Sequence, residues 1–169
     1  MRSIQVATKD DLPIIQHIAT LAYHATYIPI LGNEQVDYML KMIYSLDSLA
    51  AQMDQGHRFL VVLDGGKAVG FASFNSLDES SSVYKLQKLY VLPAQHGAGL
   101  GRYLINEVIA HAQRAGAGKL QLNVNRFNKA RGFYEKLGFE VKEQVDIPIG
   151  EGYFMNDYVM EREISFDRN

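Results

Sequence analysis

The chain of 169 residues contains no cysteine. This absence excludes disulfides, thiolate metal sites and a cysteine nucleophile, and it is typical of a protein in a reducing compartment. No apolar run is long enough to span a membrane, and residues 1–6 lack the apolar core of a signal peptide. We therefore expect a cytoplasmic location and no membrane partner. The five histidines show no metal-binding spacing such as H-E-x-x-H, so no metal is predicted.

The chain also lacks a strong excess of either charge. Its 17 Lys and Arg residues nearly balance 19 Asp and Glu residues, which gives a formal net charge of −2. This balance does not favour a nucleic-acid surface, and its slight acidity suits a cationic small substrate. The length is that of one domain with a sizeable core, so a single domain over residues 1–169 is predicted.

Apolar periodicity and turn residues predict the order of strands and helices. A capping box of Thr8 and Asp11 should begin the first helix, the turn at residues 28–32 should end it, and Asn33 should cap the second. The expected strands are 4–7, 59–63, 68–74, 83–91, 120–124, 139–145 and 154–164, and the later helices are expected from 46, after 101 and over 128–137. This order indicates a mixed α/β sheet with one main βα crossover rather than a doubly wound fold.

The most informative segment joins the apolar strand at residues 83–91 to a helix through Gly97, Gly99 and Gly101. Glycines at alternate positions let a ligand approach the backbone without Cβ clashes. The N–H groups of such a loop and of the first helical turn have no internal partners, and the helix dipole adds positive charge there. The pattern therefore indicates a phosphate or pyrophosphate site, and a plain turn between strand and helix is the alternative.

Three kinds of glycine loop could bind a phosphate here. A P-loop requires Gly-Lys-Ser/Thr, whereas Gly101 is followed by Arg102 and Tyr103. A Rossmann loop requires G-x-G-x-x-G early in a βαβ unit, whereas this loop reads G-x-G-x-G and the order of elements differs. The pyrophosphate of coenzyme A is the third candidate.

A second motif favours coenzyme A. Residues 125–139 read Asn-Arg-Phe-Asn-Lys-Ala-Arg-Gly-Phe-Tyr-Glu-Lys-Leu-Gly-Phe and follow the next expected strand. With the glycine loop before it, this segment resembles the GNAT superfamily of acetyl-CoA-dependent N-acetyltransferases. The loop of that family usually reads Gln/Arg-x-x-Gly-x-Gly/Ala, and His96 stands here where glutamine or arginine is usual. Residues 70–73, 88–91, 123–126 and 155–161 are similar to the PaiA-like branch, which is associated with polyamine acetylation.

The resemblance implies a fold and an activity. The fold would be a single GNAT-like domain with a mixed, mostly antiparallel sheet of about seven strands. Helices would flank the sheet, and two splayed central strands would bind acetyl-CoA. The activity would be direct transfer of an acetyl group to a primary amine of a small molecule, such as spermidine or spermine, and a homodimer is expected. A peptide or protein N-acetyltransferase and a CoA-binding regulator are the alternatives.

The resemblance also assigns the cofactor contacts. The backbone of the strand before the loop would pair with the pantetheine arm, and the loop amides would hold the pyrophosphate. Asn128 would contact the cofactor or cap the last helix, and Lys129 and Arg131 would reach the 3′-phosphate or face solvent. The expected cofactor-binding residues are Leu89, Tyr90, Val91, His96, Gly97, Ala98, Gly99, Leu100, Gly101, Arg102, Asn123, Asn128, Lys129, Arg131, Tyr134 and Lys136.

The expected catalytic residue is Tyr134, which the family places beside the sulfur to protonate the leaving thiolate. A phenol with a pKa of about 10 is a suitable acid for a thiolate. No motif fixes the general base or the acceptor site, for which the candidates are Tyr27, Glu34, Glu79 and Asp157. The tyrosine-rich stretch at residues 23–44 could bind a cationic amine through cation–π contacts, or it could belong to the core.

Overall fold

The computed structural model describes residues 1–80 and 82–165. Its strands are β1 (Arg2–Val6), β2 (Arg58–Asp64), β3 (Lys67–Ser76), β4 (Val83–Val91), β5 (Lys119–Asn125), β6 (Glu140–Gly150) and β7 (Tyr153–Glu163). Its helices are α1 (Leu12–Leu31), α2 (Asn33–Tyr44), α3 (Leu46–Asp54), α4 (Leu100–Arg114) and α5 (Ala130–Lys136), with short 3-10 turns η1 (Lys9–Asp11) and η2 (Pro93–Gln95).

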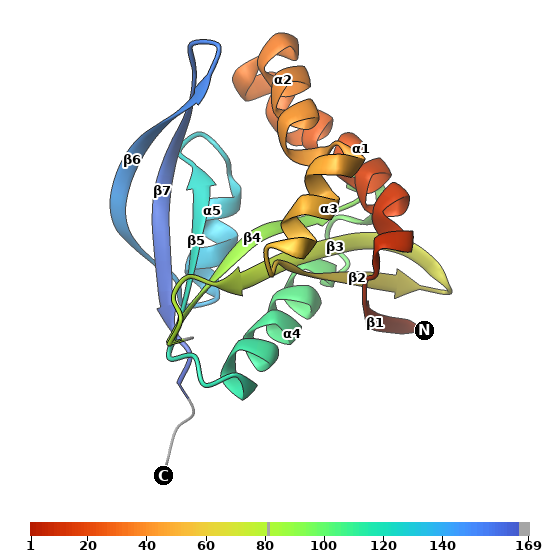
Figure 1. Cartoon of the computed structure of the whole chain (residues 1–169), viewed down its shortest axis with the longest axis vertical. Coiled ribbons are helices and arrows are strands. Elements are labelled where there is room, and N and C mark those ends of the chain that lie inside the picture. The colour runs from red at the N-terminus through yellow and green to blue at the C-terminus, as the bar shows by residue number, and fades with distance from the viewer. Residues whose placement is uncertain (81, 166–169) are drawn as a thin grey trace. The chain divides into compact units, whose positions relative to one another are not determined.

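The strands form one mixed sheet in the order β1-β2-β3-β4-β5-β7-β6 (Figure 1). Only β4 and β5 are recorded as a parallel pair among the described residues, and they are joined by α4. The predicted α/β fold with one βα crossover is therefore confirmed. The chain divides into two compact units, a first unit of residues 1–75 and 87–108 and a second unit of residues 76–86 and 109–169.

The first unit is built around β2 and β3, which are buried over most of their length. Their hairpin turn is the predicted one, because Gly65 and Gly66 both have positive φ angles (59° and 82°) that a two-residue turn of this hand requires. Helices α1 and α3 cover one face of these strands, and the first half of α4 covers the other (Figure 1). Apolar side chains at helical spacing, including Ile15, Ile18 and Ala22, form the core beneath α1.

The end of α1 differs from the prediction. The helix passes through Pro29 and continues to Leu31, where Gly32 with a φ of 83° ends it. Proline deprives only the carbonyl four residues earlier of its donor. That residue is the exposed Ala25, near the last turn of the helix, where water can bond its carbonyl. Asn33 is accordingly the first residue of α2 and not its cap, and no side-chain cap is recorded there.

The second unit contains the first residues of β4, paired from Val83 to Leu86 with Lys119 to Leu122, followed by β7 and β6 on the other side of β5. Strand β6 is longer than predicted, since its pairing with β7 continues through Pro148 to Gly150. Pro148 fits because β6 is an edge strand. Helix α5 begins at Ala130, two residues after the predicted start.

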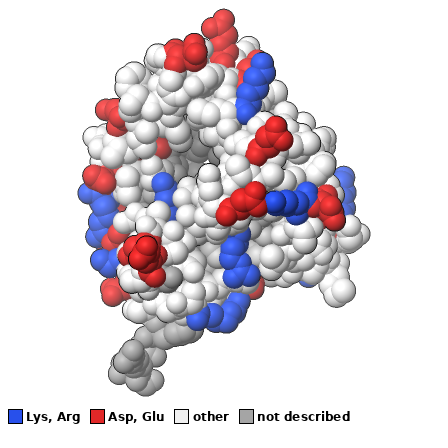
Figure 2. All heavy atoms as spheres, viewed as in Figure 1, with Lys and Arg blue, Asp and Glu red and all other residues white. Residues whose placement is uncertain are grey.

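Two further findings concern the surface. Within residues 1–80 and 82–165, no helix is long and apolar enough to cross a membrane. On the face drawn in Figure 2, acidic and basic side chains are interspersed among uncharged residues.

Gly70 in β3 has no room for a side chain. A Cβ on Gly70 would lie 2.9 Å from the Tyr90 carbonyl oxygen in β4, 3.0 Å from Val62 Cγ1 and 3.2 Å from Val91 Cγ2. The first of these atoms belongs to the backbone of a central strand, so it cannot move aside without shifting the strand. No other residue type therefore fits this position without a shift.

We expect Gly70→Ala to destabilise the fold by about 1–3 kcal/mol, the usual cost of overpacking. Urea unfolding would measure this loss. Gly132→Ala is the matched control, because no atom lies within 4 Å of its Cβ position and α5 should gain from alanine. A Gly70→Ala variant as stable as the Gly132→Ala variant would contradict the proposed strand contact.

Candidate functional site

The glycine loop of the first unit has the backbone that a phosphate cradle requires. Gly97 and Gly99 have φ angles of 85° and 77°, in the region that side chains disfavour. No atom lies within 4 Å of the position that a Cβ on Gly97 would occupy, so this part of the loop is open. The Tyr103 N–H bonds the Gly99 carbonyl, which marks the first turn of α4.

The loop amides are available for a ligand. Along residues 97–102 of the described chain, no acceptor is recorded for the backbone N–H groups, as expected for a loop that opens a helix. The loop starts from a fixed point, because the Leu92 N–H bonds the Val69 carbonyl of β3 at 2.9 Å and the Gln95 N–H bonds the Leu92 carbonyl. The backbone of this loop therefore fits a pyrophosphate, and its binding there stays a prediction.

His96 stands where the family usually has glutamine or arginine, and it was expected to contact the cofactor. Its Nε2 lies 3.2 Å from the Val91 carbonyl oxygen, so the ring bonds the preceding strand. Arg102, in the first turn of α4, is exposed. Its cationic side chain is thus available near the loop amides.

The tyrosines of the first unit are mainly core residues. Tyr23 and Tyr44 are only 4% and 3% exposed, and their rings lie 5.6 Å apart. Tyr90 of β4 packs against both of them and against Phe71. Burial raises the pKa values of Tyr44 and Tyr90 well above the ordinary value, so both phenols stay protonated. Packing therefore explains Tyr23 and Tyr44 without an acceptor amine.

A cation does occupy this cluster, and sequence reasoning missed it. Lys88 in β4 is 8% exposed, its Nζ donates to Gln52 Oε1 at 2.6 Å, and it lies 5.7 Å from the ring centroids of Tyr44 and Phe59. Burial of a lysine requires such partners. The signal in the sequence was a lysine directly before the apolar end of a strand, Leu89 to Val91.

The second unit brings two predicted site residues together. Asn123 of β5 donates from Nδ2 to Oδ2 of Asp157 in β7, over 3.4 Å. Asp157 is 3% exposed, and burial raises the pKa of its carboxyl above the ordinary 3.8. Three groups lower this pKa again, in decreasing order of effect: the hydrogen bond from Asn123, the charge of Lys85 and the charge of Arg126. Lys85 shows the converse effect, since burial lowers its pKa and Asp157 partly compensates.

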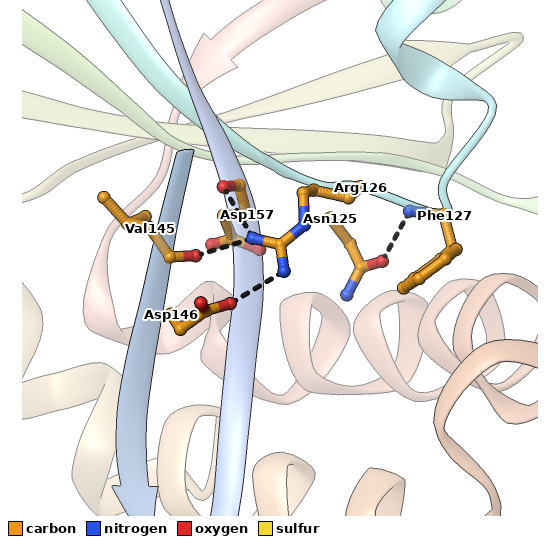
Figure 3. A network of polar contacts seen from close by, with 6 residues as sticks. All are labelled: Asn125, Arg126, Phe127, Val145, Asp146 and Asp157. Carbon is orange, nitrogen blue, oxygen red and sulfur yellow. Dashed lines mark hydrogen bonds and ion pairs between the residues drawn. The ribbon is translucent and has the colours of Figure 1, made fainter. Parts of the chain in front are cut away.

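Arg126, which sequence reasoning left without a role, fixes the end of β5 against β6 and β7 (Figure 3). Its guanidinium donates to the Val145 carbonyl at 3.1 Å, to the main-chain carbonyl of Asp157 at 3.5 Å and to the Asp146 carboxylate at 2.7 Å. The next peptide is held by the Asn125 side chain, which accepts from the Phe127 N–H. These bonds determine where the Asp157 backbone lies.

Tyr134 lies in α5 and is 8% exposed. Its ring contacts Phe133 and Phe139 edge-on, with centroids 5.2 and 5.8 Å away. Asn128 accepts from the Ala130 N–H through Oδ1 at 2.9 Å, which fulfils a local capping role just before the helix. Packing thus fixes the orientation of the Tyr134 ring.

The remaining candidates are divided between the units. In the first unit, Glu34 is exposed in the first turn of α2, and Tyr27 stacks on Tyr23 with centroids 4.4 Å apart. In the second unit, Glu79 is exposed in the loop before β4. Lys129 and Lys136 are exposed at either end of α5.

Arg131 of α5 is engaged by its neighbours. It pairs with Glu135 at 3.2 Å and its guanidinium lies 4.6 Å from the Tyr158 ring centroid. Within residues 1–80 and 82–165, no group of three or more metal-ligating side chains is found.

Comparison with known proteins agrees with this geometry. The model of the acetyltransferase (GNAT) family matches residues 21–139. The chain belongs to the GNAT acetyltransferase family. It is an acetyl-CoA-dependent N-acetyltransferase, as the resemblance of its two motifs predicted. The matched range includes the glycine loop and α5.

Individual relatives differ in what is known of them. An uncharacterised N-acetyltransferase of Mycobacterium bovis is 36% identical over 112 residues, which cover 66% of this chain and 70% of the relative. The alanine N-acetyltransferase of ribosomal protein bS18 from Haemophilus influenzae is 30% identical over 96 residues, 56% of this chain and 62% of that protein. These relatives share the family but do not define one acceptor.

Solved structures share the fold. PaiA N-acetyltransferase of Thermoplasma acidophilum, in complex with coenzyme A, has a TM-score of 0.82 at 22% identity and covers 96% of this chain and 99% of its own. The ribosomal-protein-S18-alanine N-acetyltransferase of Escherichia coli has a TM-score of 0.75 at 24% identity, covering 99% and 96%. Two acetyltransferases with different names therefore share this architecture.

We expect the stability of the protein to depend on Asp157 in a pH-dependent way. Because its pKa is raised on folding, the carboxyl contributes most favourably below about pH 3.8, and this contribution is lost as pH rises through the raised pKa. Asp157→Asn should therefore gain stability relative to the unmodified protein between about pH 4 and 7. Urea unfolding across this range measures the difference.

Glu143→Gln is the matched control, since Glu143 lies exposed in the neighbouring strand β6. A stability difference for Asp157→Asn that does not change with pH would show that burial does not perturb this carboxyl.

Proposed function

We propose that the protein transfers the acetyl group of acetyl-CoA to a primary amine of a small polyamine such as spermidine or spermine. The observation that carries this proposal is Asp157, a buried carboxylate of the second unit. Among the described residues, its one recorded side-chain hydrogen bond comes from Asn123, over 3.4 Å. A carboxylate in such surroundings attracts an ammonium group strongly. Similarity to the fold of PaiA and the PaiA-like motifs in the sequence also support it.

In this proposal the glycine loop holds the pyrophosphate through the amides of residues 97–102, assisted by Arg102. The backbone of residues 89–91 pairs with the pantetheine arm. Asn123 and Asn128 contact the arm, and Lys129 and Lys136 lie exposed for the 3′-phosphate. Arg131 is the weaker candidate for that phosphate, because Glu135 and Tyr158 already engage it.

Bound acetyl-CoA supplies the thioester that the amine attacks. Asp157 accepts a proton from the bound ammonium, directly or through water, and the neutral amine that results attacks the thioester carbonyl. The raised pKa of Asp157 makes it a stronger base than an ordinary aspartate. Tyr134 donates its phenolic proton to the departing thiolate sulfur. Arg126 holds the strand of the base, since it bonds the Asp157 carbonyl. Glu34, Glu79 and Tyr27 are the secondary candidates for contact with the acceptor.

A second candidate function is acetylation of a peptide or protein amine. It is favoured by the similarity to the bS18-alanine N-acetyltransferase of Haemophilus influenzae. A CoA-binding regulator is a third function, in which acetyl transfer would be incidental. A cytoplasmic location, a homodimer and a single functional domain over residues 1–169 stay predictions.

Tyr134→Phe should lower kcat about a hundredfold, because it removes the phenolic acid while keeping the packed ring. The KM for acetyl-CoA should change little. Release of the CoA thiol under saturating acetyl-CoA measures both. Tyr103→Phe is the matched control, as this tyrosine is 36% exposed on α4. Full turnover of the Tyr134→Phe variant at every pH would refute the acid role.

Release of the CoA thiol with a panel of amines tests the acceptor. The panel contains spermidine, spermine, putrescine, lysine and peptides with an N-terminal alanine. We expect turnover with the polyamines, and we expect Asp157→Asn to lower kcat/KM for them about a hundredfold without changing the KM for acetyl-CoA. Glu143→Gln, an exposed carboxylate in β6, should behave like the unmodified protein.

The outcomes separate the three functions. Turnover with alanine peptides alone would replace the polyamine by a protein amine. Binding of CoA without transfer to any member of the panel would favour the regulator.

A further inference from the structure

Arg2 lies against the glycine loop although the loop is far away in the sequence. From β1, its Nη2 donates to the Ala98 carbonyl at 2.5 Å, and its Nη1 lies 3.9 Å from the position that a Cβ on Gly99 would occupy. Strand β1 is itself fixed, because it pairs with β2 from Arg2 to Val6 and the Gly65 N–H bonds the Met1 carbonyl. The side chain thus approaches the loop from a rigid strand.

The contact determines the direction of one peptide group. In a trans peptide the carbonyl and the following N–H point in opposite directions, and no cis peptide bond is recorded among the described residues. A guanidinium that binds the Ala98 carbonyl therefore directs the Gly99 N–H to the opposite side of the loop. Because Gly99 tolerates both signs of φ, this peptide could otherwise rotate at low cost.

Among the described residues, no carboxylate neutralises the charge of Arg2. Within the described part of the chain, its guanidinium forms no ion pair with a carboxylate, and the Ala98 carbonyl is its recorded partner. His96 cannot replace it, since its ring bonds the Val91 carbonyl. Arg2 is also exposed, so the loop lies beside an available positive charge.

We propose that Arg2 is a positioning residue for the pyrophosphate of coenzyme A. It holds the Ala98 carbonyl away from the ligand, so that the Gly99 N–H already points toward the pyrophosphate before binding. A loop oriented in advance loses less conformational freedom on binding, which raises the affinity. This inference rests on the proposed function, which assigns the pyrophosphate to the loop. It implies that Arg2 affects only ligands that carry the pyrophosphate.

The test compares three ligands of decreasing phosphate content with a protein that carries any tag at its C-terminus. Calorimetry with Arg2→Ala should show Kd values about tenfold higher for CoA and for dephospho-CoA, whereas the inhibition constant of pantetheine stays unchanged. The KM for acetyl-CoA should rise by the same factor while kcat at saturation is retained, and Arg2→Lys should recover part of the affinity. Arg58→Ala, an exposed arginine at the start of β2, is the matched control.

Each other outcome has a distinct meaning. Unchanged affinity of Arg2→Ala for CoA would overturn the inference while leaving the proposed function intact. An equal loss for pantetheine would indicate general distortion, and a loss for CoA but not for dephospho-CoA would indicate a contact with the 3′-phosphate; either result overturns the inference. Failure of the unmodified protein to bind CoA would refute the proposed function itself.

Discussion

The backbones of β3 and β4 approach each other so closely at Gly70 that no side chain fits between them. This contact has consequences along the chain, because β4 leads directly into the glycine loop. The Leu92 N–H bonds the Val69 carbonyl, one residue before Gly70. The start of the loop is therefore held by the same pair of strands whose spacing the glycine permits. A loop rich in glycine needs such an anchor, since its backbone has little conformational preference of its own.

The second unit contains charged side chains on strands of the sheet. Burial raises the pKa of Asp157 and lowers that of Lys85, so each would be costly alone. Each partly compensates the other, and Arg126 ties the strands beneath them through two carbonyls and one carboxylate. An apolar core of similar volume would often be at least as stable as such a network, so stability alone does not account for it.

Local signals predicted most of the fold correctly. The Asp-Gly-Gly turn and the glycines that end α3, α4 and α5 all have positive φ angles, which glycine adopts readily. Such signals depend on the glycine itself, so they can be read from the local sequence. Pro29 was misread because a proline near the last turn costs a helix little when the freed carbonyl faces water. The glycine loop could be predicted as a phosphate site because such a site depends on consecutive backbone amides, which a short sequence pattern encodes. Lys88, Arg126 and the contact of Arg2 with the loop were missed, since their partners lie 36, 20 and 96 residues away. No single-sequence pattern encodes such pairings.

The position of Lys88 has a consequence for an enzyme that modifies amines. Lys88 lies in the strand proposed to bind the cofactor arm, so an accessible amine there would be a target for self-acetylation. The attack would require a neutral amine that can reach the thioester. The Nζ of Lys88 donates a hydrogen bond to Gln52 Oε1 and lies 5.7 Å from the ring centroids of Tyr44 and Phe59, so the nitrogen is held inside the cluster. The aromatic rings also exclude other molecules from its nitrogen, as its 8% exposure shows. The tyrosine-rich cluster was considered from the sequence as a binding site for a substrate amine. In the structure, it instead shields the amine of Lys88.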